Sequence, residues 1–402
     1  MKIRNTVALL ALVALVGTAC ADDGETVTTA APATTAAPAT TEAVSTAPID
    51  IGVIEMLTGF AGHYGQVLAN AALLAVDDIN AKGGGLDGRP FNLKIEDNAS
   101  ENAPTVEMTR KLGTDPDIVA IIGPTYLANL IPGQEAANEI GVPYIAASGL
   151  VAPENQPWSF KNTMDYELQV KMSTRGILEA LGATRVAAVI DKDNAAQVFT
   201  IGVVKEELDE MGLDLVYEAE ITTDQPQYGP QIGGLQEANP DAVLTLMSVE
   251  VAARFTKEAR DRGFVFPWVS PNDGLADNRL LALSDGGAEG MLTSVTHDPT
   301  RPQVIAYKEV YIAKHGGTVD PLSLYGWDMV YLLYHAMENA GSLERGAIRE
   351  ALENLDPAEC TECLHQYVND GKNNFAILDL WFQVLGPEGY VAWDVMPMVS
   401  AP

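Results

Sequence analysis

The sequence has few cysteines, few basic residues and a single long apolar run. Its 402 residues include three cysteines, at positions 20, 360 and 363. Lys and Arg total 24 against 55 Asp and Glu, a formal net charge of −31. No stripe rich in Lys and Arg follows the first residues, which excludes nucleic acid as a partner because cations supply most of that affinity. After residue 20 no apolar run approaches the roughly 20 residues that a membrane span needs.

Signatures of catalysis and of metal binding are also missing. The chain has no HExxH, no GxSxG and no P-loop. The GGGLDG stretch follows a predicted helix and precedes a predicted strand, the reverse of a dinucleotide-binding turn. The DKDN run at 191–194 lacks the glycine of a calcium loop. An exported enzyme is therefore the least favoured interpretation, and we expect no cofactor and no metal.

The histidines and the late cysteine pair give weak signals of chemistry. The five histidines are scattered without ligand spacing, and each is expected at the surface or as a capping residue: His63, His297, His315, His335 and His365. Cys360 and Cys363, spaced as CTEC, are expected to form a small disulfide outside the cytoplasm. A redox motif and a zinc site are the alternatives, but zinc would need two further ligands.

The first segment predicts export. Lys2 and Arg4 precede an apolar run at 7–16, and small residues then lead to Cys20, which is the plan of a secretory signal peptide. The segment resembles a bacterial lipoprotein signal, which implies an acylated Cys20 that anchors the protein on the extracytoplasmic face of the membrane. Gly17 departs from that pattern, so an ordinary signal peptide followed by a free or structural cysteine remains the alternative.

Residues 21–47 consist almost wholly of Ala, Thr, Pro, Ser and acidic residues. Such a segment cannot bury enough surface to offset its ordering entropy, so we expect a disordered tether. An O-glycosylated stalk is compatible with the same composition.

From residue 49 the chain alternates short β-branched runs with helical patterns. Strand and helix in alternation predict an α/β fold with parallel sheets. The first part predicts strands at 49–55, 91–97, 118–122 and 143–146 and helices at 65–81, 103–112 and 129–140. A second α/β unit follows, with strands at 186–190, 213–219, 242–247 and 265–270 and helices at 166–181, 198–211, 230–237 and 249–262. A strand at 291–295 and helices at 302–315, 324–340 and 345–355 are interpreted as the chain returning to the first unit.

Several stretches in this order resemble the type I solute-binding proteins of ABC transporters, in particular the Leu/Ile/Val-binding group. They are IGVIEMLTGFAGHYGQ, AVDDINAKGGGLDGRPFNLKIEDNAS, AIIGPTYLAN, GVPYIAASG, SPNDGLADNRL and YGWDMVYLLYHAMENAG. The resemblance implies two Rossmann-like lobes joined by a three-segment hinge, with a ligand bound between them. It also implies that the protein is a monomer and that its protein partner is a permease. The expected lobes are 48–164 with 297–375 and 165–296 with 376–402.

The expected ligand site lies beyond the carboxyl ends of the strands, as in other open parallel sheets. In the first lobe Thr125, Ser148 and Gly149 are expected to receive a carboxylate, although Thr125 is equally suited to cap a helix. The resemblance assigns Tyr64 to a tyrosine that lies over the ligand, with simple packing as the alternative. It assigns Asp273 and Gly274 to the ligand's ammonium group, although an acid beside glycine is also common in turns.

Two departures from the Leu/Ile/Val pattern concern the same site. Tyr126 stands where a small residue is often found, and DNAAQVF replaces an aromatic in the second lobe, which leaves Ala195, Ala196, Gln197 and Phe199 as candidates. Asn194 in the same run is also assigned to the site. Both departures indicate a pocket reshaped for a ligand other than a plain aliphatic amino acid. The sequence therefore predicts a binding protein for an amino acid or a related small carboxylate or amide. A ligand-sensing receptor of the same fold is the alternative.

Overall fold

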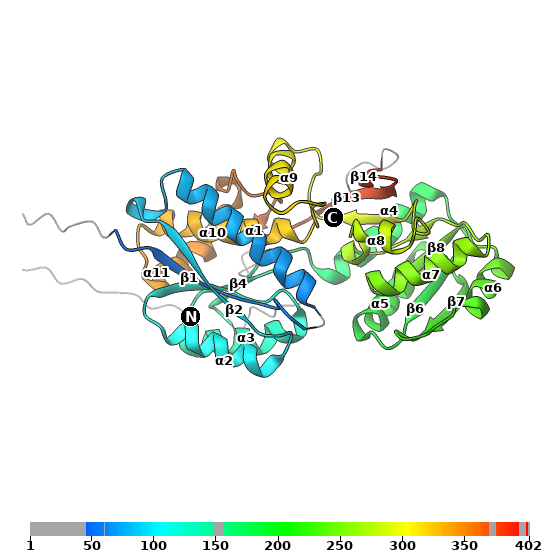
Figure 1. Cartoon of the computed structure of the whole chain (residues 1–402), viewed down its shortest axis with the longest axis horizontal. Coiled ribbons are helices and arrows are strands. Elements are labelled where there is room, and N and C mark those ends of the chain that lie inside the picture. The colour runs from blue at the N-terminus through cyan, green and yellow to red at the C-terminus, as the bar shows by residue number, and fades with distance from the viewer. Residues whose placement is uncertain (1–45, 60, 148–155, 370–374, 394–398, 401–402) are drawn as a thin grey trace, which may run out of the picture. The chain divides into compact units, whose positions relative to one another are not determined.

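The computed structural model describes residues 46–402 except 60, 148–155, 370–374, 394–398 and 401–402. Two sheets dominate these residues (Figure 1), and both have helices packed on them. The expected α/β fold with two parallel-sheet lobes is confirmed.

The first sheet is parallel throughout and has the strand order β2-β1-β3-β4-β5. Its strands are β1 Ile49–Glu55, β2 Phe91–Asp97, β3 Ile118–Ile122, β4 Tyr144–Ala146 and β5 Ser159–Lys161. The connecting segments are α1 Gly62–Ala81, η1 Leu86–Gly88, α2 Asn102–Thr114 and α3 Leu127–Ile140. Strand order reverses between β1 and β3, and that reversal point is where parallel sheets bind small molecules.

The second sheet repeats this order in β7-β6-β8-β9-β10 and adds two antiparallel strands, β13 and β14, beside β10. Its strands are β6 Val186–Asp191, β7 Leu215–Ile221, β8 Ala242–Leu246, β9 Trp268–Val269, β10 Leu292–Val295, β13 Asp379–Gly386 and β14 Gly389–Ala392, and β15 Val399–Ser400 pairs with β13. Its helices are α4 Tyr166–Leu181, α5 Ala195–Met211, α6 Gly229–Ala238, α7 Val249–Asp261 and α8 Arg279–Leu283, with η3 Asp273–Leu275.

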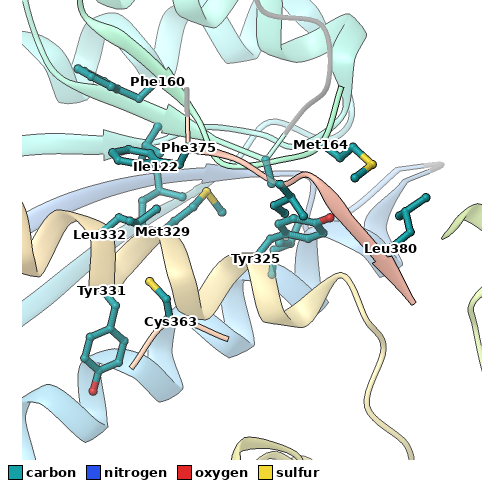
Figure 2. Close-up of a cluster of buried hydrophobic side chains, with 14 of the residues drawn as sticks. Ile122, Phe160, Met164, Tyr325, Met329, Tyr331, Leu332, Cys363, Phe375 and Leu380 are labelled. Atoms are coloured by element: carbon teal, nitrogen blue, oxygen red, sulfur yellow. The ribbon is translucent and has the colours of Figure 1, made fainter. Parts of the chain in front are cut away.

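Three late helices follow β10, and α10 packs on α1 of the first lobe. They are α9 Pro302–His315, α10 Ser323–Ala340 and α11 Arg345–Asn354, and η4 Pro357–Glu359 and the hairpin of β11 Val368–Asn369 and β12 Phe375–Ala376 come next. Figure 1 shows α10 (orange) alongside α1 (blue). Buried Tyr325, Met329 and Leu332 of α10 belong to the same apolar cluster as Ile122 of β3 (Figure 2), so residues far apart in sequence share one core.

The start of α1 is fixed by a close backbone approach. A Cβ on Gly65 would lie 2.2 Å from the carbonyl oxygen of Met56. Only glycine admits this contact, which brings the first turns of the helix against the end of β1. The helix also begins at Gly62, earlier than the predicted residue 65.

Candidate functional site

A cavity of about 280 Å³ lies at the strand ends and has walls from both lobes. It is lined by Met56, Tyr64, Thr125, Tyr126, Tyr166, Asp273, Gly274, Ala276, Asp277, Asp320 and Leu322. Five of the predicted site residues therefore meet in one place: Tyr64, Thr125, Tyr126, Asp273 and Gly274. A larger hollow of about 450 Å³ is lined by residues of α1, α9, α10 and the 361–364 segment. We place the candidate site in the smaller cavity because it lies at the ends of β1, β3 and β9.

Tyr64 and Tyr126 supply aromatic surface from the first lobe. Tyr64 lies in the first turns of α1, and its ring meets that of His63 edge-on at 5.8 Å. Burial raises the pKa of the Tyr64 hydroxyl, and the nearby carboxylates of Glu250, Asp320 and Asp277 raise it further. The hydroxyl therefore stays protonated at neutral pH and can donate to a ligand.

A buried acid lies behind Thr125. Glu55 at the end of β1 is 1% exposed, and its Oε1 lies 3.5 Å from Oγ1 of Thr125. Its Oε2 has no hydrogen-bond partner among the described residues. Burial raises the pKa of Glu55 well above its ordinary value, and hydrogen bonds from Thr125 and Met56 offset only part of this rise. Sequence reasoning missed this acid, whose one signal is a charge that ends an apolar strand.

The second lobe contributes Asp273 from a short turn after β9. Asn272 shapes this turn: its Oδ1 accepts from the Gly274 amide at 2.9 Å, and its Nδ2 donates to Tyr166 Oη at 2.9 Å. Burial raises the pKa of Asp273, while the side chain of Gln169 opposes the rise. A cationic ligand group beside Asp273 would favour its ionised form.

Asp277 and Asp320 add negative charge that sequence reasoning missed. His63 Nε2 lies 3.2 Å from Oδ2 of Asp320 and 4.0 Å from Oδ2 of Asp277. Asp277 also accepts from Nε of Arg279 at 2.8 Å. The potential ligand atoms of His63, Asp277 and Asp320 lie within 4.8 Å of one another, so a histidine expected to be isolated belongs to a compact polar group.

Three further predicted residues lie on α5 and are not among those that line the cavity. Asn194 is the N-cap of this helix, and its Oδ1 accepts from the Ala196 amide at 3.1 Å. Gln197 is half-buried, and Phe199 is 45% exposed. The Phe199 ring lies 6.2 Å from that of Tyr166, which does line the cavity. Ser148, Gly149 and Cys20 lie outside the described residues.

The expectation that every histidine is a surface or capping residue is wrong for two of them. His297 is 1% exposed and His365 is 2% exposed. His365 is paired with Asp328 of α10, a long-range contact with no local sequence signal. The packing of α10 beneath the late loop accounts for this burial.

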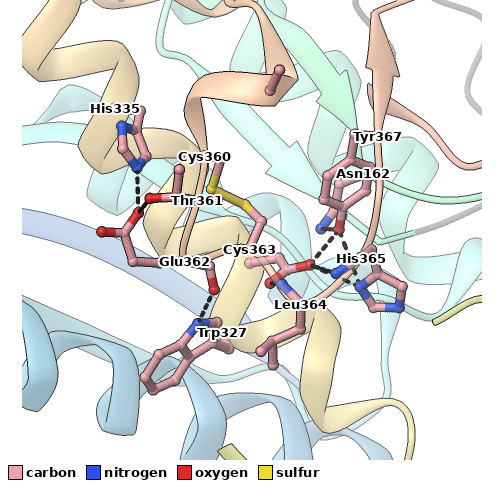
Figure 3. Close-up of a disulfide and its surroundings, with 12 residues drawn as sticks. Asn162, Trp327, His335, Cys360, Thr361, Glu362, Cys363, Leu364, His365 and Tyr367 are labelled. Atoms are coloured by element: carbon pink, nitrogen blue, oxygen red, sulfur yellow. Dashed lines mark hydrogen bonds and ion pairs between the residues drawn. A yellow bond between two sulfur atoms is a disulfide. The ribbon is translucent and has the colours of Figure 1, made fainter. Parts of the chain in front are cut away.

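The late cysteines form a disulfide in a turn that contacts the same helix (Figure 3). Cys360 and Cys363 have a Cα–Cα distance of 5.3 Å. Between them, the carbonyl of Glu362 accepts from Trp327 Nε1 at 3.0 Å, and the Glu362 carboxylate lies 3.0 Å from His335 Nε2. The disulfide therefore braces a turn that is also held to α10 at two points.

Within the described part of the chain no helix is long and apolar enough to cross a bilayer. A family profile described as periplasmic binding protein matches residues 48–386. The leucine-specific-binding protein of Salmonella typhimurium is 24% identical over 76% of this chain and 81% of its own length. The Leu/Ile/Val-binding protein of Escherichia coli is 25% identical over 79% and 82%.

Solved structures show the same fold. The branched-chain amino acid transporter substrate binding protein LivJ from Streptococcus pneumoniae, in complex with isoleucine, has a TM-score of 0.77 and 21% identity. The match covers 88% of this chain and 99% of that one. An ABC transporter substrate-binding protein from Sphaerobacter thermophilus gives 0.75 at 19% identity, over 88% and 98%. The chain thus belongs to the type I periplasmic binding proteins, the non-enzymatic extracytoplasmic solute-binding family that includes the Leu/Ile/Val-binding proteins of ABC transporters.

Proposed function

We propose that this protein binds an amino acid, or a related small carboxylate or amide, between its lobes and delivers it to an ABC import permease. The observation that carries the proposal is the cavity itself. The first-lobe wall has hydroxyl donors beside Asp320, and the second-lobe wall has the carboxylates of Asp273 and Asp277. A zwitterion needs this arrangement, because its two charged ends require partners of opposite character.

In this proposal Thr125, with Ser148, Gly149 and backbone amides of the first lobe, holds the ligand carboxylate. Oriented amides and hydroxyls favour an anion without a full positive charge. Asp273 and Gly274 receive the ammonium group.

The tyrosines and α5 would determine how the rest of the ligand fits. Tyr64 covers the ligand, and Tyr126 and Tyr166 narrow the pocket. Asn194, Gln197 and Phe199 act as an outer rim, since Phe199 already contacts Tyr166. Relatives are named for leucine, isoleucine and valine, but Asp277 and Asp320 make this pocket more polar than an aliphatic side chain requires.

Closure around the ligand would use three crossovers between lobes. We propose lobes of 48–164 with 297–375 and of 165–296 with 376–402. Membership of β5 in one sheet and β6 in the other, and of β10 and β13 in the second, supports these boundaries. Contacts to both walls at once would shift the lobes to a closed state that a permease recognises.

We further propose that an acylated Cys20 anchors the protein and that residues 21–47 tether it. One acyl chain holds weakly, so stable anchoring would need more than one chain. Labelling with a radioactive fatty acid, compared between the wild type and Cys20→Ala, tests this point directly. Equal labelling of the two proteins would contradict it.

A thermal-shift screen against amino acids, amides and aromatic acids tests the proposed ligand class. A binder present at 100 times its dissociation constant stabilises the protein by about 2.7 kcal/mol. Hits are then measured by calorimetry with the wild type, with Ser148→Ala combined with Asp273→Ala, and with the exposed-site control Asp224→Asn. Binding that is as tight in the double variant as in the wild type would contradict the site, and no hit in any class would contradict the function.

A further inference from the structure

Residues beside the stretches that link the two sheets gather around one buried carboxylate, that of Asp328 on α10. These stretches follow β5, follow β10 and precede β13. Asp328 is 0% exposed. None of the motifs used to place the ligand explains why a charge is buried at this point.

Asp328 holds the 364–367 segment, which precedes the β11–β12 hairpin and then β13, and through this segment it holds the stretch after β5 (Figure 3). Its oxygens accept from the amides of Leu364 at 2.7 Å and His365 at 2.9 Å, from Nδ1 of His365 at 2.8 Å and from Oη of Tyr367 at 2.8 Å. Tyr367 in turn accepts from Asn162 Nδ2, just after β5, at 3.2 Å. Four hydrogen-bond donors therefore converge on this one carboxylate.

The second stretch is joined to these donors by two rings. Tyr325, one turn before Asp328, stacks on His365 with centroids 4.3 Å apart, and its hydroxyl bonds to Thr296 just after β10. The next residue, His297, meets the His365 ring edge-on at 5.8 Å. The crossovers after β5 and after β10 are therefore in contact with one cluster, together with the 364–367 segment that leads through the β11–β12 hairpin to β13.

His297 has no acceptor for an added proton. Both of its ring nitrogens are buried without a hydrogen-bond partner in the described chain, as is Nε2 of His365. The charged or titratable groups that face His297 are His365 and Lys308 of α9. Burial lowers the pKa of His297 well below its ordinary value, and electrostatic interaction with His365 and Lys308 lowers it further, so His297 is neutral in this arrangement.

The groups that face His365 are different, because Asp328 lies among them. They are Asp328 and Tyr325 of α10, Tyr367 beside β11, His297 after β10, and Asp273 at the cavity. A proton on His365 has the Asp328 carboxylate as partner. When acid adds a proton to His297, no group of the cluster can accept a hydrogen bond from it. Protonated His297 therefore needs contact with water.

We propose that this cluster is a proton-responsive lock on the hinge, which holds the binding-competent arrangement while His297 is neutral and releases it when His297 gains a proton. The proposal rests on the proposed function, since it concerns regulation of that same site. The present arrangement has cavity walls from both lobes. Water can reach His297 only if the crossovers move. This movement separates the two cavity walls, so a smaller fraction of the molecules is able to bind the ligand.

The test compares His297→Gln with His315→Gln, the same change at an exposed histidine on α9. L-leucine binding is measured by calorimetry at pH 7.5 and pH 5.5, with ligand-free unfolding midpoints at both values. With an ordinary histidine pKa of about 6.5 in the released state, one proton favours release by up to about tenfold at pH 5.5. We expect the wild type and His315→Gln to lose up to about tenfold more affinity on acidification than His297→Gln.

An equal loss of affinity in all three proteins would overturn the lock and leave the proposed function standing. If leucine binds none of them at pH 7.5, the ligand is wrong, and the ligand-free midpoints still decide the lock. They support it if the midpoint of His297→Gln falls less on acidification than that of the wild type, and overturn it if the two fall equally. His297→Asn replaces the glutamine variant if that variant does not fold.

Discussion

Glu55 is a buried acid at the end of β1 in the first sheet, and its folded environment favours the neutral form. Because its folded pKa is raised above the unfolded value, folding takes up a proton between these two values. Stability from this group is then fully present below the unfolded pKa and declines as pH rises, by about 1.4 kcal/mol per pH unit, until the folded pKa is passed.

Glu55→Gln should therefore stabilise the protein at neutral pH. Glutamine has nearly the shape of a protonated glutamate and cannot ionise. We expect an increase of at least about 1 kcal/mol in the free energy of unfolding at pH 7.5 and little change at pH 4. Urea unfolding at both pH values, with the exposed-site control Glu107→Gln, measures this difference. A variant less stable than the wild type at pH 7.5 would show that the charge is needed for folding.

Asp273 differs from Glu55 because it borders the cavity. Asp273→Asn removes the charge that we assign to the ligand's ammonium group, and a hydrogen bond to a charged group contributes about 1.5–3 kcal/mol. We expect a loss of about 10- to 100-fold in affinity for an amino acid, with an unfolding midpoint without ligand that is equal or higher. Calorimetry and melting curves separate the two effects, and unchanged affinity would remove Asp273 from the site.

At the scale of elements, the packing of α10 on α1 joins the late helices to the first lobe. Gly326 makes this contact possible, because a Cβ there would lie 2.4 Å from the carbonyl oxygen of Leu68. The backbones of the two helices approach each other at this point. A side chain of any size would separate them.

Gly326→Ala should destabilise the protein by about 1–3 kcal/mol, since added volume in a packed interface forces the backbone to shift. The matched control is Gly346→Ala on α11, where a Cβ meets nothing within 4 Å. That change should stabilise by about 0.5–1 kcal/mol, because alanine is the better helix former. Chemical unfolding of both variants tests the pair, and a similar effect of the two substitutions would contradict the close approach.

At the scale of the molecule, a net charge of −31 means that the folded chain repels itself. Several basic side chains already lie in exposed ion pairs such as Lys111–Glu96 and Lys257–Asp285. Salt screens both the repulsion and these pairs, but single exposed pairs contribute little. The repulsion should therefore determine the sign of the salt effect.

We expect sodium chloride between 0.02 and 0.3 M to raise the unfolding midpoint by about 2–4 °C. Calorimetric scans at pH 7.5 without ligand measure the shift. Choline chloride at equal ionic strength is the control, because screening does not depend on which cation is present. A falling midpoint would mean that attractive pairs outweigh the repulsion.

The order of strands and helices was predictable because burial leaves a local periodic pattern. The runs at 49–55, 91–97 and 118–122 became β1, β2 and β3 with the predicted bounds. The short β5 was missed, since three buried residues carry no pattern of their own. The β13–β14 pair was missed as well, although β13 spans eight residues. The strand predicted at 265–270 is limited to Trp268–Val269 in the structure. It begins just after Pro267, because proline has no amide hydrogen to donate to the neighbouring strand.

The candidate site likewise contains residues that the sequence predicted and residues that it did not predict. Tyr64, Thr125 and Asp273 lie shortly after the ends of β1, β3 and β9, in the first turn of α1, in a loop and in the η3 turn, so position along the chain was enough to propose them. Asp320 was not predictable, because it meets His63 across 257 residues. Its place depends on how α9 and α10 return to the first lobe.

The sequence alone determined the alternation of elements, the resemblance to a binding-protein family and the loops that border the cavity, because each of these depends on residues within short stretches of chain. Only the tertiary structure decided which acids share that cavity and that Asp328, His365 and His297 meet where the crossovers converge. These contacts join residues from elements that lie far apart in sequence. Their free energy depends on burial and on distances that exist only after the lobes have folded.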